Sequence, residues 1–168
     1  LTGDARFVDA HTLSITVADG TASQLRFEQA IIAAGSQPVR LPGIPYEDPR
    51  VIDSTGALAL QDIPARLLVI GGGIIGLEMA TVYAELGSAV TVVELSDGLI
   101  PGADRDLVKP LEKRLKGLLA AIHLKTKVTG VRAEKDALIA SFEGAGVVPD
   151  ATAGWFRRGA ERALSIVS

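Results

Sequence analysis

Cysteine is absent from this chain of 168 residues, and the absence excludes several kinds of chemistry. Without thiols the chain forms no disulfide, holds no zinc through thiolates and supplies no thiol nucleophile or redox dithiol. A basic excess is missing too, because 17 lysines and arginines stand against 20 aspartates and glutamates. This balance argues against a nucleic-acid partner.

Long apolar runs are also missing. The longest uncharged apolar stretch, Leu67 to Leu77, contains four glycines and is much shorter than the roughly 20 apolar residues of a membrane span. With 48% hydrophobic and 22% charged residues, the composition is typical of a folded globular chain. The sequence opens at Leu1 without the pattern of a secretory signal, so we expect no membrane contact and a cytoplasmic location.

The N-terminal third favours short strands. Apolar and polar residues alternate from Thr12 to Val17, as in a half-buried strand. Asp19-Gly20 is typical of a hairpin turn, and Gln24 to Gln29 would be the return strand. Ala30 to Ala34 predicts a short buried strand, and Ser54 is placed to cap a short helix.

Strands and helices alternate in the rest of the chain. Buried strands are predicted at Arg66–Ile70, Ala89–Val93 and His123–Lys127, followed by a hairpin over Val128–Phe142. The predicted apolar helix faces are Ile75, Met79, Val82 and Leu86 in a first helix, and Leu107, Leu111, Leu115, Leu118 and Ile122 in a second, capped by Asp104 or Asp106. This order predicts an α/β fold with a Rossmann-like, doubly wound parallel sheet.

A glycine pattern, Gly71-x-Gly73-x-x-Gly76, lies between the first of these strands and its helix. In a dinucleotide-binding turn the first glycine permits the tight turn and the second lets the backbone approach a pyrophosphate. The third lets the helix pack against the strand. The pattern alone is weak, because glycine-rich turns are common, but the flanking strand and helix strengthen it. The helix N-terminus would then offer free N–H groups to the phosphates.

Two carboxylates accompany this motif. Glu94 ends the next strand, where it can accept hydrogen bonds from the adenosine ribose. Its charge would repel a 2′-phosphate, so NAD is favoured over NADP. Glu78 lies inside the helix, and the residues alone leave open whether it is a solvated glutamate or a carboxylate near the nicotinamide.

These motifs resemble the NAD domain of the pyridine nucleotide–disulfide oxidoreductases. Longer stretches are similar to one branch of that family, the bacterial dihydrolipoamide dehydrogenases. The residues that carry the resemblance are Leu68–Ala80, Val92–Glu94, Ile31–Pro38, Ile44–Val51, Asp53–Thr55 and Leu99–Pro110. The resemblance covers roughly Leu1 to Gly144 and implies an internal fragment of a longer enzyme.

The resemblance implies a role for each matching position. The NAD contacts would be Gly71, Gly72, Gly73, Ile74, Ile75, Gly76, Glu78 beside the nicotinamide, Glu94 on the ribose and Val128 near the adenine. The FAD contacts would be Ala5, Ala34, Gly35 and Ser36. The family usually has threonine where this chain has Ala34, and the missing hydroxyl would cost about 0.5–1.5 kcal/mol.

The same resemblance implies a division of the chain into three parts. Residues 1–62 would be part of an FAD-binding domain with its linker, and residues 63–144 an incomplete NAD-binding domain. Residues 145–168 match nothing in the family and favour one short helix from Trp155 to Ile166. His11 and His123 do not match the family's catalytic His–Glu pair, so no catalytic residue and no metal ligand is predicted here.

The predicted function is therefore the NAD- and FAD-binding portion of a dihydrolipoamide dehydrogenase-like flavoprotein, inactive as this chain alone. In such an enzyme electrons pass from a dithiol through a cysteine pair and FAD to NAD. The longer enzyme of which this chain would be a fragment would be a homodimer within a 2-oxoacid dehydrogenase complex. Two alternatives stay open: a fragment of a mercuric or glutathione reductase-like enzyme or an NADH oxidase relative, and a non-enzymatic nucleotide-binding remnant.

Overall fold

The computed structural model describes residues 2–135, 137–144 and 162–165. Its contacts divide the chain into two compact units, Leu1–Ser36 and Gln37–Ser168. The boundary predicted at residue 62 separates expected nucleotide-binding parts rather than compact units, and it stays a prediction. Residues 37–62 belong to the second unit because Val51 and Ala57 are buried in its two hydrophobic clusters.

The first unit is a three-stranded antiparallel sheet. Its strands are β1 (Asp4–Asp9), β2 (Thr12–Thr16) and β3 (Ala22–Arg26), paired in that order. Gly20, with φ of +85°, lies in the turn of the predicted hairpin. Thr12 and Ile15 are buried, whereas all of β1 and β3 is exposed. The pairing is as predicted, but a sheet of this size buries little apolar area.

The strand predicted at Ala30–Ala34 does not form. No secondary structure is assigned there, and Ile31 and Ile32 are 95% and 74% exposed. A strand needs neighbours for its backbone N–H and C=O groups, and in the described part of the chain β1, β2 and β3 pair only with one another. The apolar composition of residues 30–34 predicted a buried strand, but no described strand lies beside this segment to bury it.

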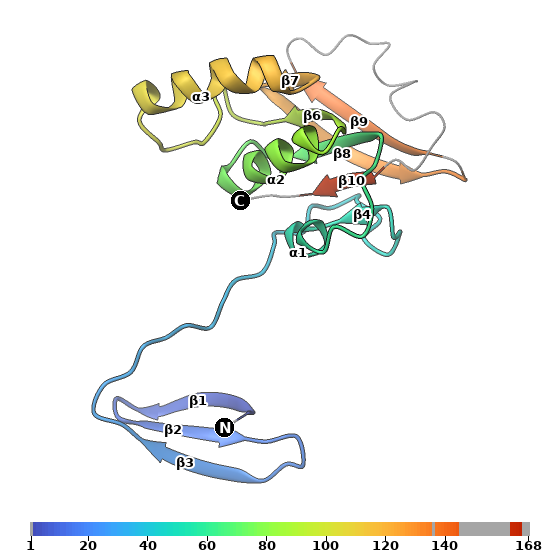
Figure 1. The fold of residues 1–168 in the computed structure, drawn as a ribbon. Helices are drawn as coiled ribbons and strands as arrows, with labels where there is room; N and C mark the ends of the chain where they lie inside the picture. The colour runs from blue at the N-terminus through green and yellow to red at the C-terminus, as the bar shows by residue number, and fades with distance from the viewer. Residues whose placement is uncertain (1, 136, 145–161, 166–168) are drawn as a thin grey trace. The chain divides into compact units, whose positions relative to one another are not determined.

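The second unit is built on a five-stranded parallel sheet (Figure 1). The strands, in spatial order, are β4 (Val51–Ile52), β10 (Arg162–Ser165), β5 (Arg66–Ile70), β6 (Ala89–Val93) and β7 (Ala121–His123). The registers pair Ile70 with Val93 and Val93 with His123, so these strands end at one edge. The predicted α/β fold with a parallel sheet is confirmed.

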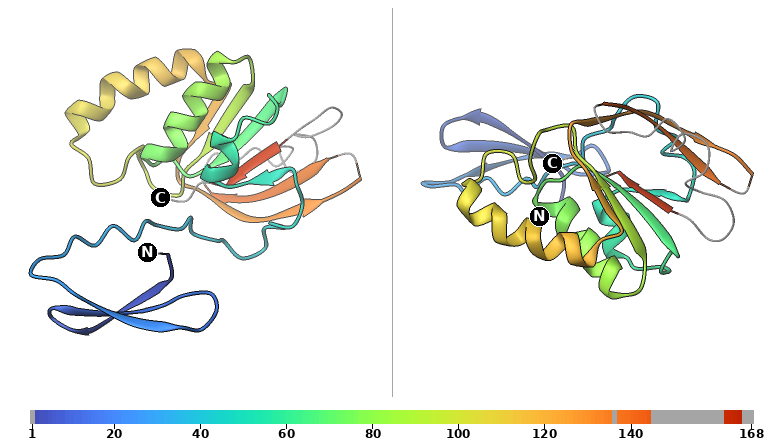
Figure 2. Two further views of the ribbon diagram at one scale, coloured as in Figure 1. Left: turned by 60° about the horizontal axis from the view of Figure 1, so that its bottom comes forward. Right: turned by 90° about the horizontal axis from the view of Figure 1, so that it is seen from above.

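Different layers cover the two faces of this sheet (Figure 2). Leu67 and Val69 pack with the helices α1 (Ser54–Leu58), α2 (Ile74–Glu85) and α3 (Arg105–Leu118). Leu68 and Ile70 pack against the antiparallel hairpin of β8 (Thr126–Ala133) and β9 (Leu138–Gly144). Burial on both faces explains why these strands are apolar throughout rather than alternating. The second face carries a hairpin because the chain turns back after β7 instead of entering another helix.

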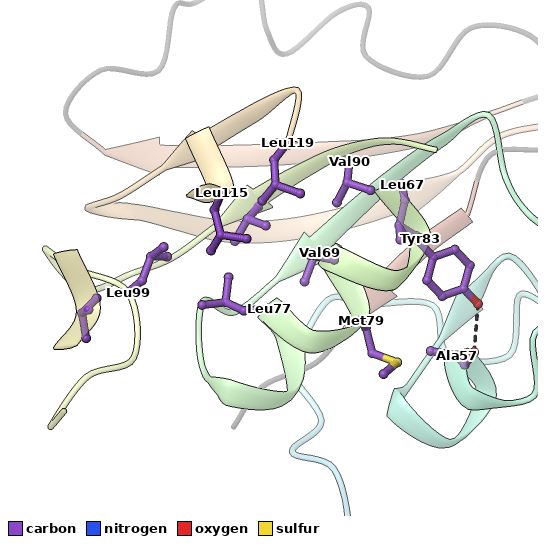
Figure 3. Packing of buried hydrophobic residues seen from close by; sticks show 13 residues of the cluster. Ala57, Leu67, Val69, Leu77, Met79, Tyr83, Val90, Leu99, Leu115 and Leu119 are labelled. Carbon is purple, nitrogen blue, oxygen red and sulfur yellow. Dashed lines mark hydrogen bonds between the residues drawn. The ribbon is translucent and has the colours of Figure 1, made fainter. Parts of the chain in front are cut away.

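The buried face of α2 differs from the predicted one. Its buried residues are Gly76, Leu77, Met79, Ala80 and Tyr83, whereas Ile75, Val82 and Leu86 are exposed. The difference arises because α2 contacts α1 and α3 as well as the sheet, so its buried surface is broader than one stripe. Figure 3 shows the Tyr83 hydroxyl, which donates to the Ala57 carbonyl of α1 at 2.9 Å.

Two other expectations need correction, and a third is confirmed. In α3 the buried residues are Val108 and Leu115, and Leu107 is 76% exposed because the helix turns it away from the core. The cap of α1 is Asp53 rather than Ser54, since the Asp53 carboxylate accepts the Gly56 N–H at 2.9 Å. The N-cap of α3 is Asp104, one of the two predicted candidates, although its side chain makes no capping hydrogen bond.

The predicted C-terminal helix is wrong for residues 162–165. They form β10, which pairs in parallel with β4 on one side and β5 on the other. Pairing on both sides satisfies the backbone groups that a short isolated helix would leave partly exposed to water. Residues 155–161 and Ile166 of that prediction lie outside the described residues. Within the described residues, no helix combines the length and apolarity that crossing a membrane requires.

Candidate functional site

The candidate site lies where β5 and β6 end. In an open parallel sheet, ligands bind outside the carboxyl ends of the strands. β5 leads into the glycine turn at Gly71 and α2, and β6 leads into Glu94. The Gly71 N–H donates to the Val93 carbonyl at 2.8 Å, so the turn is joined to the end of β6.

The glycine turn is tight in the way that its spacing predicts. Gly71 has a φ of +111°, a region that other residues rarely adopt. A Cβ on Gly76 would overlap the Gly71 carbonyl oxygen, so the helix can begin this close to the strand only without a side chain. Gly73 is the N-cap of α2. Ile74 and Ile75 form the exposed start of the helix, 59% and 43% accessible.

Glu94 is buried, with an exposed fraction of 8%. One carboxylate oxygen accepts the Gly72 N–H at 2.6 Å, and the other accepts the Ser96 N–H at 2.7 Å. Two backbone donors of this kind stabilise a buried charge. Glu94 therefore holds the glycine turn and the loop after β6 in one arrangement, a structural role that the sequence did not predict.

Further backbone hydrogen bonds fix this edge. Thr126 N–H donates to the Glu94 carbonyl at 3.0 Å, and Lys125 N–H donates to the Ser96 carbonyl at 2.8 Å. The Ile100 N–H donates to the Gly72 carbonyl at 2.9 Å, and a Cβ on Gly72 would lie 2.7 Å from Leu99. The loop after β6 thus packs directly on the glycine turn.

A cavity of about 490 Å³ opens at this edge of the sheet. Gly71, Glu94 and Val128 all line it, so the fold brings together residues that are far apart in the sequence. The volume lies within the range of small-molecule sites. The other lining residues are Leu41, Pro42, Ile70, Val93, Leu95, Ser96, Pro101, Thr126, Lys127 and Thr129.

This arrangement fits a dinucleotide. Helix α2 has no side-chain cap and no acidic residue in its first turn, so no side chain of the helix itself competes for its first N–H groups. Glu94 offers acceptors beside the same turn. Within the described residues, no cluster of His, Cys, Asp and Glu is arranged to hold a metal ion.

Several predicted contacts do not lie at the cavity. Glu78 is exposed on α2 and does not line it. Of the glycine turn and the start of α2 only Gly71 lines it, and the other predicted contacts there do not: Gly72, Gly73, Ile74, Ile75 and Gly76. The predicted FAD residues Ala5, Ala34, Gly35 and Ser36 belong to the first unit and are all exposed. By themselves these exposed residues do not make up an FAD-binding site, and their role stays a prediction.

Sequence reasoning missed most of the cavity wall. Leu41 and Pro42 come from the loop before β4 and belong to no motif that predicts a ligand contact. Ser96, Thr126 and Lys127 follow the strand ends directly, and this position relative to the strands is the signal that would have identified them.

Comparisons with known proteins identify the family. The family model described as pyridine nucleotide-disulphide oxidoreductase matches residues 2–151. The chain belongs to the pyridine nucleotide-disulphide oxidoreductase family. This family binds FAD and NAD, which confirms the two predicted cofactors at the level of the family.

Several curated relatives of this chain are dihydrolipoyl dehydrogenases. The enzyme of Haemophilus influenzae is 53% identical over 146 residues, which cover 84% of this chain and 30% of the relative. That of Vibrio cholerae is 50% identical over 142 residues, with the same coverage. The chain thus spans about 30% of the length of these relatives, and its resemblance to this branch is confirmed.

Solved structures of family members have the same fold. The Cu(II) complex of a mutant of RclA, an HOCl-induced flavoprotein disulfide reductase from Escherichia coli, matches with a TM-score of 0.75 and 28% identity. The match covers 99% of this chain and 35% of that chain. LpdA from Mycobacterium tuberculosis matches with a TM-score of 0.74 and 25% identity, covering 98% and 35%.

Proposed function

We propose that this oxidoreductase chain is the NAD(H)-binding portion, with a smaller FAD-binding portion, of a dihydrolipoamide dehydrogenase-like flavoprotein. One observation carries the proposal. The buried Glu94 lies at the end of β6, is joined to the glycine turn by its 2.6 Å hydrogen bond and lines the same cavity as Val128. A carboxylate beside a glycine turn is the arrangement that recognises a ribose next to a pyrophosphate.

In this proposal each part of NAD has its own contacts. The pyrophosphate binds at the turn from Gly71 to Gly76 and the N-terminus of α2, and the ribose hydroxyls donate to Glu94. The adenine lies along Val128. Glu78 lies toward the nicotinamide, which supplies the electron-accepting chemistry when it is bound. Ala5, Ala34, Gly35 and Ser36 contact FAD in the whole protein.

The reaction of the whole protein is proposed to convert dihydrolipoamide and NAD to lipoamide and NADH. This chain alone is proposed to be inactive, because it has no cysteine to exchange electrons with a dithiol. For the whole protein we propose a homodimer that serves a 2-oxoacid dehydrogenase complex in the cytoplasm. The similarity to dihydrolipoyl dehydrogenases over 84% of the chain supports these proposals.

NADH fluorescence titration of the purified chain tests the nucleotide site. We expect saturable binding, tighter for NADH than for NADPH because the Glu94 carboxylate disfavours a 2′-phosphate. Glu94→Gln should weaken NADH binding about tenfold or more, since the ribose loses a charged acceptor. The matched control is Glu85→Gln, the same change at an exposed position at the far end of α2.

Circular dichroism of each variant ensures that only folded protein is compared. Equal affinity of Glu94→Gln and wild type, or tighter binding of NADPH, would contradict the proposed role of Glu94. Absence of saturable binding in a folded wild-type chain would contradict the nucleotide site itself. Turnover of dihydrolipoamide by the chain with added FAD would contradict its proposed inactivity.

A further inference from the structure

The loop before β4 supplies one wall of the cavity. Leu41 and Pro42 lie on this loop and line the cavity together with Lys127, Val128 and Thr129 of β8. Neither residue belongs to a helix or a strand, so backbone hydrogen bonds of regular secondary structure do not fix their positions. Their position depends on the contacts that the loop makes with itself and with β8.

Tyr46 fixes the position of Leu41 in this loop. Its hydroxyl accepts the Leu41 N–H at 2.8 Å, across a turn of the loop. The Arg40 guanidinium lies over the Tyr46 ring, 4.8 Å from its centroid, at the distance of a cation–π contact. Tyr46 is itself half-buried and packs with the cluster between the sheet and the hairpin. The ring is thus anchored in the core while its hydroxyl reaches the cavity wall.

Gly43 joins the loop to β8. Its carbonyl accepts the Val131 N–H of β8 at 2.8 Å. Gly43 has a φ of +75°, and a Cβ there would lie 3.5 Å from the Gly130 Cα. Further along the loop, the Arg50 guanidinium donates to the Glu134 carbonyl at 2.9 Å. The loop is therefore hydrogen-bonded to the hairpin at two points, and Tyr46 holds Leu41, the residue before Pro42.

We propose that Tyr46 is a positioning residue for the adenine end of the dinucleotide, acting through Leu41 and Pro42. This inference rests on the proposed function, because it takes the cavity to receive the adenosine. An adenine needs apolar surface on its faces, and Leu41, Pro42 and Val128 are the apolar groups that the loop and the hairpin provide. When the Tyr46 hydroxyl is lost, the Leu41 N–H loses its acceptor and the wall is no longer preorganised.

The test compares Tyr46→Phe with Tyr83→Phe in the full chain. Each variant removes one hydroxyl that bonds the backbone, but Tyr83 bonds Ala57 on the helical side of the sheet. The probe is AMP, which carries the adenine and no nicotinamide, measured by isothermal titration and by displacement of NADH. We expect Tyr46→Phe to raise the Kd of AMP about threefold to tenfold. Tyr83→Phe should lower the Tm by about 2–4 °C and leave the Kd of AMP unchanged.

The outcomes separate this inference from the proposed function. If wild type binds neither NADH nor AMP, the proposed function fails and this inference fails with it. If wild type binds AMP and Tyr46→Phe binds it equally well, only the positioning role is overturned. If Tyr46→Phe does not fold, Leu41→Ala replaces it, since it removes apolar wall area directly. A Kd of AMP unchanged in a folded Leu41→Ala variant would then overturn the inference.

Discussion

Replacement of Glu94 by glutamine should destabilise the second unit, quite apart from any effect on a ligand. The carboxylate is 8% exposed and accepts backbone N–H groups from Gly72 at 2.6 Å and Ser96 at 2.7 Å. Glutamine keeps the shape but offers one oxygen and one NH2 group, so one backbone donor faces another donor. A hydrogen bond to a charged group contributes about 1.5–3 kcal/mol, and a buried unsatisfied donor costs about 1–3 kcal/mol. We expect the free energy of unfolding to fall by about 2–4 kcal/mol.

Urea denaturation followed by far-UV circular dichroism measures this difference. A loss of this size is a large fraction of the roughly 5–15 kcal/mol of a typical domain. It should lower the Tm by about 3–4 °C for each kcal/mol in a unit of this size. Ser96→Ala is a sharp control, because the bond to Glu94 uses the Ser96 backbone N–H, which alanine retains. Glu85→Gln controls for the loss of one negative charge.

The expected pattern is a large effect at Glu94 and small effects at Ser96 and Glu85. A Glu94→Gln variant within about 0.5 kcal/mol of wild type, the range of ordinary surface substitutions, would refute the reasoning. The Glu94 hydrogen bonds would then not hold the turn. Weaker NADH binding in that variant would then have to be assigned to the ribose contact alone.

Two further substitutions test other parts of the site. Gly76→Ala should lower the unfolding free energy by about 3 kcal/mol or more, because the new Cβ overlaps the Gly71 carbonyl oxygen and backbone cannot give way cheaply. Thermal denaturation measures this loss. The control is Gly117→Ala in α3, where an added Cβ has no atom within 4 Å, and it should instead stabilise the helix by up to about 1 kcal/mol. Equal Tm shifts in the two variants would contradict the prediction. The Arg50 side chain, hydrogen-bonded to Asp48, holds the pKa of that carboxyl below its ordinary value of 3.8. Asp48→Asn should therefore cost about 1 kcal/mol at pH 6, and this difference should fade as the pH falls through 3.8 toward the lowered value. Urea denaturation at pH 6 and pH 2.5 checks it, and a difference that is undiminished at the lower pH would contradict the assignment.

The central strands and the glycine turn were predictable because local sequence determines them. Arg66–Ile70 and Ala89–Val93 form the strands β5 and β6 with the predicted bounds. Both are short apolar runs bounded by turn residues, and burial on both faces leaves them no alternative. The turn follows from Gly71, whose φ of +111° few other residues tolerate. These features depend on residues within a few positions of one another.

The wrong predictions involve partners that lie far away in the sequence. Ala30–Ala34 has strand composition, but no described neighbour pairs with it. Residues 162–165 have helical composition, yet β4 and β5 offer them backbone partners on both sides. The exposed Ile75 and buried Tyr83 of α2 follow from the position of α1, which supplies the acceptor for the Tyr83 hydroxyl. Periodicity in one segment contains no information about these neighbours.

The candidate site shows the same division. Gly71 and Glu94 were predicted from motifs and Val128 from the family resemblance, and all three lie at one cavity. The loop wall at Leu41 and Pro42 was missed, because its position follows from the Tyr46 and Gly43 contacts rather than from a motif. The hydrogen bond from the Gly72 N–H to Glu94 was also missed, since it joins residues 22 positions apart.

The structural role of Glu94 and its proposed ribose contact are compatible because a carboxylate has more acceptor capacity than the fold uses. An ionised carboxylate offers about four lone-pair sites, and the Gly72 and Ser96 N–H groups occupy two of them. The remaining sites can accept two ribose hydroxyls without disturbing the turn. The negative charge of a 2′-phosphate would instead be repelled by the Glu94 carboxylate. This carboxylate cannot rotate away, because both of its oxygens already accept hydrogen bonds from backbone N–H groups. The hydrogen bonds that hold the turn therefore also sharpen the proposed preference for NAD over NADP.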